Sequence, residues 1–277
     1  MPDKYGIIGY PLEHSLSPFM HNRYAYYLGK DETYEAFEIN PGRLERELIN
    51  MYDAHILGLN ITVPYKQKIL SYICDIDDAA HMIGAVNTLK YTDNGYIGYN
   101  TDAAGLSISL KESGIELKGK DVLILGAGGA ARAAAYVCIS QECSSLSVLN
   151  RTYEHAEKIA KDFSGTAYDY SSADRLDRNE YIVIQATKVG MYPNTEEHLP
   201  IPDTLYSKFS AGVDLIYNPK ETDFIKTVSK RGVKVINGFC MLINQGLASR
   251  RIWKPDEIIS SDIRRKVFNE CINYSWS

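Results

Sequence analysis

The sequence is poor in cysteine, and its few cysteines do not form the pattern of a metal site or a disulfide framework. There are five, an odd number, at irregular positions: Cys74, Cys138, Cys143, Cys240 and Cys271. No pair has the C-x-x-C spacing of a zinc knuckle. Such a pattern is typical of a reducing compartment, so we expect free, mostly buried thiols and a cytoplasmic protein.

Long apolar runs and an excess of positive charge are also missing. The longest apolar stretch, residues 122–139, contains Arg132 and three glycines, which argues against a membrane span. Residues 1–4 lead directly into a strand-like run, so no signal peptide is expected. The formal net charge is -5, and an acidic surface repels nucleic acids and acidic membranes. A local basic pocket for a phosphate is compatible with this charge.

The pattern that is present is an alternation of strand and helix signals. One helix is expected to begin at Ser17-Pro18, because serine is a suitable N-cap and proline a suitable first helical residue. A hairpin is expected over residues 86–91 and 96–100, with a turn at Asp93-Asn94-Gly95. Further strand-like runs lie at 5–9, 33–39 and 56–63.

The alternation of strand and helix signals continues after residue 101, but the strand-like runs there are short and continuously apolar. A helix is expected at about 102–113, and the tail from Met241 is mainly helical. Short, continuous apolar runs lie at 122–125, 146–149, 182–185, 213–216 and 233–236. Such runs, spaced by helices, indicate strands covered on both faces, as in a parallel sheet. We therefore predict an α/β protein with two lobes, joined near residues 100–105 and again near residue 238.

One of these strands ends in a glycine loop suited to a dinucleotide. Residues 126–131 read Gly126-Ala127-Gly128-Gly129-Ala130-Ala131 and open an alanine-rich helix, which matches G-x-G-x-x-G/A. The glycines permit a tight turn and close approach to a pyrophosphate at the positive end of that helix. Because a strand precedes the loop and a helix follows it, the pattern favours dinucleotide binding over an ordinary glycine turn. It predicts a Rossmann-type, doubly wound parallel sheet.

The next strand ends at Asn150-Arg151-Thr152, where the type of dinucleotide is selected. A free ribose 2′-hydroxyl usually meets an acidic residue about 20 residues after the loop, and none is present here. Arg151 offers a forked, permanent positive charge suited to a phosphate, with Asn150 and Thr152 as neutral donors. We therefore predict NADP as the cofactor, with His155 as a weaker contributor of charge.

Small polar residues gather where segments of the first lobe end. They lie at Ser15-Leu16-Ser17, at residues 60–66 with Lys66, at 84–88 and at Asn100-Thr101-Asp102. In an α/β sheet, this edge faces the ligand. Neutral hydrogen-bonding groups suit a polyhydroxylated ring, although singly each residue could be a cap or a turn.

Taken in order, these motifs resemble those of shikimate dehydrogenases over nearly the whole chain. The resemblance lies in residues 9–18 (GYPLEHSLSP) with His21-Asn22, 60–66 (NITVPYK), 84–88 (GAVNT), 100–102 (NTD), 126–130 (GAGGA), 150–152 (NRT) and 238–245 (GFCMLINQ). It implies reversible NADPH-dependent reduction of 3-dehydroshikimate to shikimate, in the biosynthesis of chorismate and the aromatic amino acids.

The resemblance also implies a role for individual residues. Lys66 and Asp102 would form the catalytic pair, with Lys66 as proton donor and acceptor. The residues implied in substrate binding are Ser15, Ser17, Asn60, Thr62, Asn87, Tyr217 and Gln245. Those implied in cofactor binding are Gly126, Ala127, Gly128, Gly129, Ala130, Asn150, Arg151, Thr152, Gly238 and Met241. A substrate domain would comprise residues 1–101 with the returning helices 239–277, and an NADP domain residues 102–238.

Two residues depart from the family pattern. Gln185 stands where the family often has asparagine, which leaves the local nicotinamide contacts open. His155 stands where many relatives carry a second basic residue for the 2′-phosphate.

Two other functions stay open from the sequence. One is a quinate/shikimate dehydrogenase that uses NAD, and the other is a non-catalytic NADP-binding protein. No metal site is expected, because His14 and His21 lack the geometry of a ligand pair, and no G-x-S-x-G elbow of a hydrolase occurs. The expected partner is the small-molecule substrate, without nucleic acid or membrane, and the protein could be a monomer or a homodimer.

Overall fold

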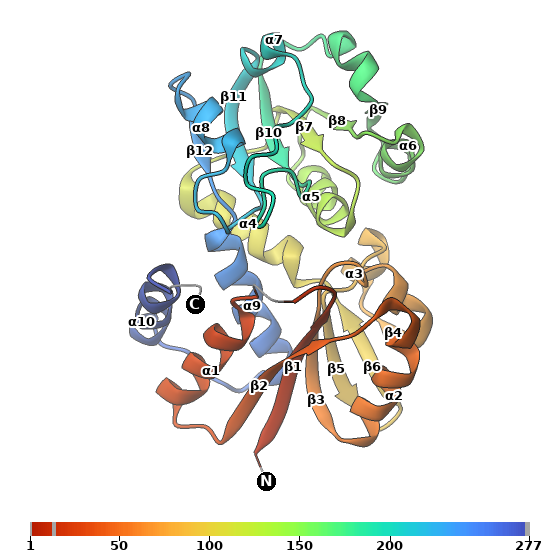
Figure 1. Cartoon of the computed structure of the whole chain (residues 1–277), viewed down its shortest axis with the longest axis vertical. Coiled ribbons are helices and arrows are strands. Elements are labelled where there is room, and N and C mark those ends of the chain that lie inside the picture. Colours follow the sequence, from red (N-terminus) through yellow and green to blue (C-terminus); the bar gives the residue numbers. More distant parts are fainter. Residues whose placement is uncertain (1, 13–14, 275–277) are drawn as a thin grey trace. The chain divides into compact units, whose positions relative to one another are not determined.

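Two six-stranded sheets organise the protein, and each belongs to a separate unit of the chain (Figure 1). The computed structural model describes residues 2–12 and 15–274. The first unit comprises Met1–Ala104 and Ile243–Ser277, and the second comprises Gly105–Leu242. The C-terminal segment therefore returns to the first unit.

The sheet of the first unit is mixed, with the strand order β2-β1-β3-β5-β6-β4. Its first three strands are parallel, whereas β5 runs antiparallel to β3 and forms a hairpin with β6. The bounds of the strands are β1 (Asp3–Gly9), β2 (Glu32–Glu38), β3 (Ile56–Ile61), β4 (Asp75–Ile76), β5 (Thr88–Thr92) and β6 (Gly95–Tyr99).

Helices cover both faces of this sheet because successive strand residues point to opposite sides. Ile7 packs with Tyr5, Tyr34 and Trp253 on one face, whereas Ile8 packs with Leu48 on the other. The first face therefore contacts α9 and the second contacts α2. The helical elements of this unit are α1 (Ser17–Leu28), η1 (Pro41–Arg43), α2 (Leu44–Asp53), η2 (Lys68–Tyr72), α3 (Asp78–Ile83), α10 (Ser261–Ile272) and most of α9 (Phe239–Trp253).

The sheet of the second unit is entirely parallel, with the order β12-β11-β10-β7-β8-β9. The order reverses between β7 and β10, which is the point where doubly wound sheets bind their ligands. The strands are β7 (Asp121–Leu125), β8 (Ser145–Leu149), β9 (Thr166–Tyr168), β10 (Tyr181–Gln185), β11 (Phe209–Asp214) and β12 (Lys234–Ile236). The helices are α4 (Thr101–Ser113, shared with the first unit), α5 (Gly129–Ser140), α6 (Tyr153–Asp162), η3 (Tyr170–Arg175), α7 (Asp203–Tyr206) and α8 (Asp223–Ser229).

The predicted α/β class, with a Rossmann-type parallel sheet in the second half, is confirmed. One predicted strand, residues 213–216, is placed wrongly, since β11 ends at Asp214. The Asp214 carboxylate accepts the backbone N–H of Ile216 at 3.0 Å, so the chain turns away from the sheet there. Among the residues that the structure describes, no helix has the length and apolar character needed to cross a membrane.

Candidate active site

Lys66 is anchored at the end of the segment that follows β3. The neighbouring Tyr65 is fully buried, and its hydroxyl donates to the carbonyl of Ile39. The carbonyl of Lys66 itself accepts the backbone N–H of Val86 at 2.7 Å. The backbone of Lys66 is therefore fixed on both sides, which limits the positions its amine can reach.

The Lys66 amine contacts the carboxylate of Asp102 at 2.5 Å, from Nζ to Oδ2. The side chains are 16% and 7% exposed, so water screens this ion pair much less than a surface pair. Asp102 lies in the first turn of α4, where a negative charge is favoured by the helix dipole. Asn100 caps this turn, because its Oδ1 accepts the N–H of Ala103 at 3.2 Å. The start of the helix thus holds the carboxylate in place.

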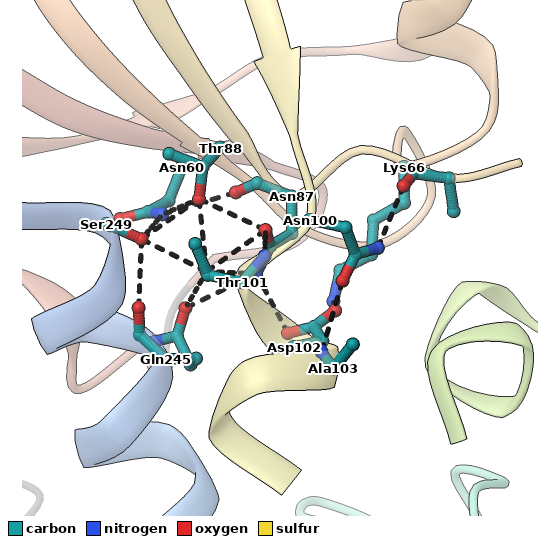
Figure 2. A network of polar contacts seen from close by, with 11 residues as sticks. Asn60, Lys66, Asn87, Thr88, Asn100, Thr101, Asp102, Ala103, Gln245 and Ser249 are labelled. Atoms are coloured by element: carbon teal, nitrogen blue, oxygen red, sulfur yellow. Dashed lines mark hydrogen bonds and ion pairs between the residues drawn. The ribbon is translucent and has the colours of Figure 1, made fainter. Parts of the chain in front are cut away.

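Asn87 binds the other oxygen of the same carboxylate. Its Nδ2 donates to Oδ1 of Asp102 at 2.9 Å, and its Oδ1 accepts the backbone N–H of Thr101 at 2.7 Å. Asn87 precedes β5, and its own N–H is held by the carbonyl of Tyr99 at 3.0 Å. Figure 2 shows Lys66, Asp102 and Asn87 as one continuous polar chain.

Further buried side chains complete this network on the side away from Lys66 (Figure 2). Asn60 at the end of β3 donates to the hydroxyl of Ser249 on α9 at 2.9 Å. The carbonyl Oε1 of Gln245 lies 3.4 Å from the Asn87 amide nitrogen. The network therefore joins β3, β5, α4 and α9, and consists of neutral hydrogen-bonding groups apart from the one ion pair. It also includes Thr88 and Thr101.

The other sequence-predicted substrate residues of the first unit lie in two further places. Ser17 is buried at the start of α1, and its N–H donates to the Ser15 hydroxyl at 3.4 Å. Thr62 follows β3, and its methyl group occupies the space that a Cβ at Gly9 would need, at 2.5 Å. Among the residues that the structure describes, no hydrogen bond joins these three side chains to Lys66, Asp102 or Asn87. Glu13 and His14 of the opening motif lie outside the described residues.

His21 lies inside the first unit rather than at this network. Its ring stacks on that of Tyr34, with centroids 4.3 Å apart. Burial lowers the pKa of the imidazole well below its ordinary value, and the charge of Arg250 acts in the same direction. The neutral ring thus forms part of the packing around Tyr34.

The glycine loop of the second unit has the local geometry of a phosphate cradle. Gly126 has a φ of +109°, and a Cβ there would lie 3.0 Å from the backbone of Ala186. Gly128 is the N-cap of α5, and a Cβ there would meet nothing within 4 Å. The backbone at Gly128 is therefore open to an approaching group, and Ala127, Gly129 and Ala130 adjoin it in the sequence.

The end of β8 presents an exposed arginine. The side chain of Asn150 donates to the carbonyl of Thr152 at 2.9 Å, which closes the turn that carries Arg151. Thr152 is the N-cap of α6, and His155 follows within its first turn. Burial raises the pKa of the neighbouring Tyr170, and the Arg151 charge opposes that rise. The guanidinium of Arg151 is thus close to one aromatic neighbour and is otherwise accessible.

A third group of residues of the second unit surrounds the buried Asp214. Its carboxylate accepts hydrogen bonds from the Ile216 N–H and the Thr222 hydroxyl, and burial raises its pKa to about 7. The N–H of Gly238 donates to the carbonyl of Ile216 at 2.9 Å. These contacts hold the segment that carries the half-buried Tyr217.

Gly238 and Gln185 each fit closely to a loop of this unit. A Cβ at Gly238 would lie 2.2 Å from the carbonyl oxygen of Leu215, so only glycine fits. Met241 lies buried one turn further on, in α9. The fully buried Gln185 folds back on its own loop, because its amide accepts the N–H of Thr187 at 2.5 Å and donates to the carbonyl of Val189 at 3.2 Å.

Sequence reasoning did not identify Tyr34, Ser249 or Asp214 as members of these groups. Ser249 lies four residues after Gln245, so helical periodicity places it on the same face of α9. That spacing was the one available signal. A tyrosine within a strand and an aspartate at a strand end are too common to be informative.

Comparison with known proteins identifies relatives for both units. The family described as shikimate dehydrogenase substrate binding domain matches residues 7–89, and shikimate/quinate 5-dehydrogenase matches residues 108–203. A protein of Methanococcus aeolicus named shikimate dehydrogenase (NADP(+)) is 40% identical over 264 residues, which cover 91% of this chain and 92% of the relative.

Solved structures agree with these matches. The chorismate mutase/shikimate 5-dehydrogenase fusion protein from Clostridium acetobutylicum has a TM-score of 0.88 and 34% identity, with 97% of each chain covered. Shikimate 5-dehydrogenase from Thermus thermophilus, in complex with NADP(H) and shikimate, has a TM-score of 0.84 and 32% identity, with 97% of this chain and 99% of that chain covered.

Proposed function

The chain belongs to the shikimate dehydrogenase family, and from this premise we propose that it reduces 3-dehydroshikimate reversibly to shikimate with NADPH. The observation that carries the assignment to particular residues is the buried ion pair of Lys66 and Asp102. The pathway role follows from the reaction: shikimate is an intermediate in the biosynthesis of the aromatic amino acids.

Lys66 is the proton donor of this reaction. In the reducing direction, its ammonium donates a proton to the substrate carbonyl oxygen as that oxygen gains negative charge. In the reverse direction, the neutral amine accepts the proton of the substrate hydroxyl. Asp102 orients the amine through its Oδ2, and Asn87 holds the same carboxylate through its Oδ1. The carboxylate that orients Lys66 is therefore fixed before the substrate binds.

The substrate-binding residues are neutral, which suits hydroxyl groups. Asn87 and Gln245 lie in the network beside Asp102, with Asn60 behind them, and Thr62 follows the same strand as Asn60. In this proposal Thr62, Asn87 and Gln245 contact the ring hydroxyls or the carboxylate, and Asn60 lies nearby. Ser15 and Ser17, next to each other in space, hold the carboxylate, and Tyr217 also contacts the substrate.

The residues of the second unit fit NADP. The open space at Gly128 and the positive φ of Gly126 suit a pyrophosphate at the N-terminus of α5. Arg151 holds the 2′-phosphate together with Asn150 and Thr152, while Gly238 and Met241 flank the nicotinamide. When bound, NADPH supplies the hydride.

The match of residues 7–89 to a substrate binding domain supports separate binding roles for the two parts of the chain. Residues 1–101 with the helices of 239–277 bind the substrate, and residues 102–238 bind NADP.

We also place the protein in the cytoplasm. The thiols of Cys74, Cys138, Cys143 and Cys271 support this location, since none of them forms a disulfide.

A matrix of two substrates and two cofactors tests the function. Purified protein is given shikimate or quinate with NADP or NAD, and formation of the reduced cofactor is followed by its near-ultraviolet absorbance. We expect the highest kcat/KM with shikimate and NADP. A preference for NAD or quinate would support a quinate/shikimate dehydrogenase instead. No activity in any combination would support a non-catalytic NADP-binding protein.

A further inference from the structure

We propose that Ser249 and Tyr34 are positioning residues for the catalytic pair. They act through Asn60 and the hydroxyls of Thr88 and Thr101, which together orient the amide of Asn87 and with it the Asp102 carboxylate. This inference rests on the proposed function, and it adds two residues that no motif of the family resemblance contains.

The orientation of the Asn60 amide follows from a neighbouring group that can accept a hydrogen bond but cannot donate one. Its Nδ2 lies 3.2 Å from the backbone carbonyl of Asn87, which can only accept, so the NH2 group must face that side. The opposite atom, Oδ1, then accepts the Tyr34 hydroxyl at 2.7 Å. Tyr34 is 4% exposed and Asn60 4% exposed, so water does not replace either contact.

Ser249 supplies the nearest of the three acceptors around the Asn60 amide nitrogen. Nδ2 of Asn60 lies 2.9 Å from the Ser249 hydroxyl and 3.1 Å from that of Thr88. The Ser249 hydroxyl donates in turn to the carbonyl of Gln245, one helical turn earlier, at 3.0 Å. Its proton is therefore directed along α9, and its lone pairs point toward the strands. Ser249 is fully buried, so its truncation would remove the shortest of the three acceptor contacts and leave the two amide hydrogens to the Asn87 carbonyl and the Thr88 hydroxyl.

Three hydroxyls transmit this arrangement to Asn87. The Thr101 hydroxyl lies 3.1 Å from that of Ser249 and can donate to it, because Ser249 gives its own proton to Gln245. The Thr88 hydroxyl lies 2.9 Å from that of Ser249 and 3.2 Å from that of Thr101, and its single proton goes to Asn87. The Thr88 hydroxyl donates to Oδ1 of Asn87 at 3.0 Å. The N–H of Thr101 donates to the same oxygen at 2.7 Å.

With Oδ1 of Asn87 held by two donors, its Nδ2 must face Asp102. That nitrogen donates to Oδ1 of the carboxylate at 2.9 Å, which leaves Oδ2 for Lys66. A loosened Asn60 or Thr88 would remove one of the two donors on Asn87 Oδ1 and leave the amide held there by the Thr101 N–H alone, which would weaken its hold on one side of the carboxylate. The direct consequence is a misplaced Lys66 amine, and misplacement of about 1 Å can lower a rate about 100-fold.

The test compares Tyr34→Phe and Ser249→Ala with matched variants. Each removes one hydroxyl, and the Phe ring keeps its place against His21. Tyr24→Phe is the control for Tyr34, because Tyr24 is fully buried and its hydroxyl has no hydrogen-bond partner among the described residues. Ser109→Ala is the control for Ser249, because Ser109 is a buried helical serine that donates to the carbonyl of Gly105, four residues earlier.

We expect Tyr34→Phe and Ser249→Ala each to lower kcat about tenfold, with the KM for NADP unchanged and the controls near wild type. A substitution that only disturbs the structure would lower kcat by the same factor with Asp102 present and with Asp102 replaced by Asn. Each variant is therefore also combined with Asp102→Asn. In that background, the two substitutions should cause little further loss of kcat, because the group they position is already altered.

Two results would overturn the inference: a kcat for both variants equal to that of their controls, or an equal fold-loss in the Asp102→Asn background. If Ser249→Ala does not fold, as judged by its thermal unfolding, Tyr34→Phe decides the question through its fold-loss in the two backgrounds. The Tyr34 hydroxyl also contacts the Ser17 side chain, and a loss that arises there would be the same with and without Asp102→Asn. Inactivity of the wild-type protein toward shikimate would instead contradict the proposed function, and the inference would fall with it.

Discussion

Asp102 shares its carboxylate between Lys66 and Asn87, with one oxygen 2.5 Å from the Lys66 amine and the other 2.9 Å from the Asn87 amide. Because the carboxylate is only 7% exposed to solvent, each of its partners replaces water that the ion would otherwise bind. The surrounding protein therefore fixes the positions of the Lys66 amine and the Asp102 carboxylate. The role of proton donor that we propose for Lys66 depends on this geometry.

The exposed guanidinium of Arg151 leads to a prediction about cofactor choice. Replacement of Arg151 by Gln should raise the KM for NADP about 10- to 100-fold, because a charge-assisted contact to the 2′-phosphate contributes about 1.5–3 kcal/mol. The KM for NAD should change little. Steady-state kinetics with both cofactors measure the ratio. The control is Lys161→Gln, which removes an equal charge at the opposite end of α6, and an unchanged ratio in the Arg151 variant would argue against this phosphate site.

The close contact of Gly238 with Leu215 leads to a prediction about stability. A Cβ at position 238 would lie 2.2 Å from a backbone oxygen, which cannot move as a flexible side chain could. Gly238→Ala should therefore lower the free energy of unfolding by about 1–3 kcal/mol and weaken NADP binding. Gly42→Ala is the control, since a Cβ there has nothing nearer than 3.8 Å. Equal stability of the two variants in denaturant titrations would be inconsistent with this steric constraint.

Asp214 leads to a prediction about pH. Burial raises the pKa of its carboxyl from 3.8 to about 7, so the folded protein holds this proton more tightly than the unfolded chain. The resulting stabilisation is complete below about pH 4 and is lost as the pH rises through about 7. The loss is on the order of 4 kcal/mol, since each pKa unit corresponds to about 1.4 kcal/mol.

Asp214→Asn tests this because asparagine does not titrate. The unfolding free energy of wild type minus that of the variant should fall between about pH 4 and pH 7 and then level off. Denaturant titrations across this range measure the difference. A difference that is constant with pH would show that the Asp214 carboxyl has an ordinary pKa.

Much of the second unit was predictable because its strands are buried on both faces. Continuous apolar runs such as 122–125 and 182–185 correspond directly to β7 and β10. The edge strands β4 and β9 escaped prediction because two or three residues show no periodicity. The strand end at Asp214 was missed because Leu215 and Ile216 are apolar, and a side-chain hydrogen bond, rather than hydrophobicity, ends the strand.

The site was predictable in part. The order of the motifs indicated that Lys66 and Asp102, 36 residues apart, would act together, and the structure places their side chains in contact. No local pattern marks Tyr34 or Ser249, because their importance comes from tertiary contacts with Asn60. Such contacts join segments as far as 189 residues apart, which sequence spacing cannot relate.

The turnover of Lys66→Met tests the central claim most directly, because methionine approximates the length of the side chain and removes its proton. The measurement is kcat for reduction of 3-dehydroshikimate, together with the dissociation constant of NADP. Lys68→Met serves as the control, since Lys68 is an exposed lysine two residues away. We predict that kcat falls about 100- to 10,000-fold while NADP affinity stays near that of wild type. A kcat close to that of the Lys68 control, or a comparable loss of NADP affinity, would contradict the role of Lys66 as proton donor.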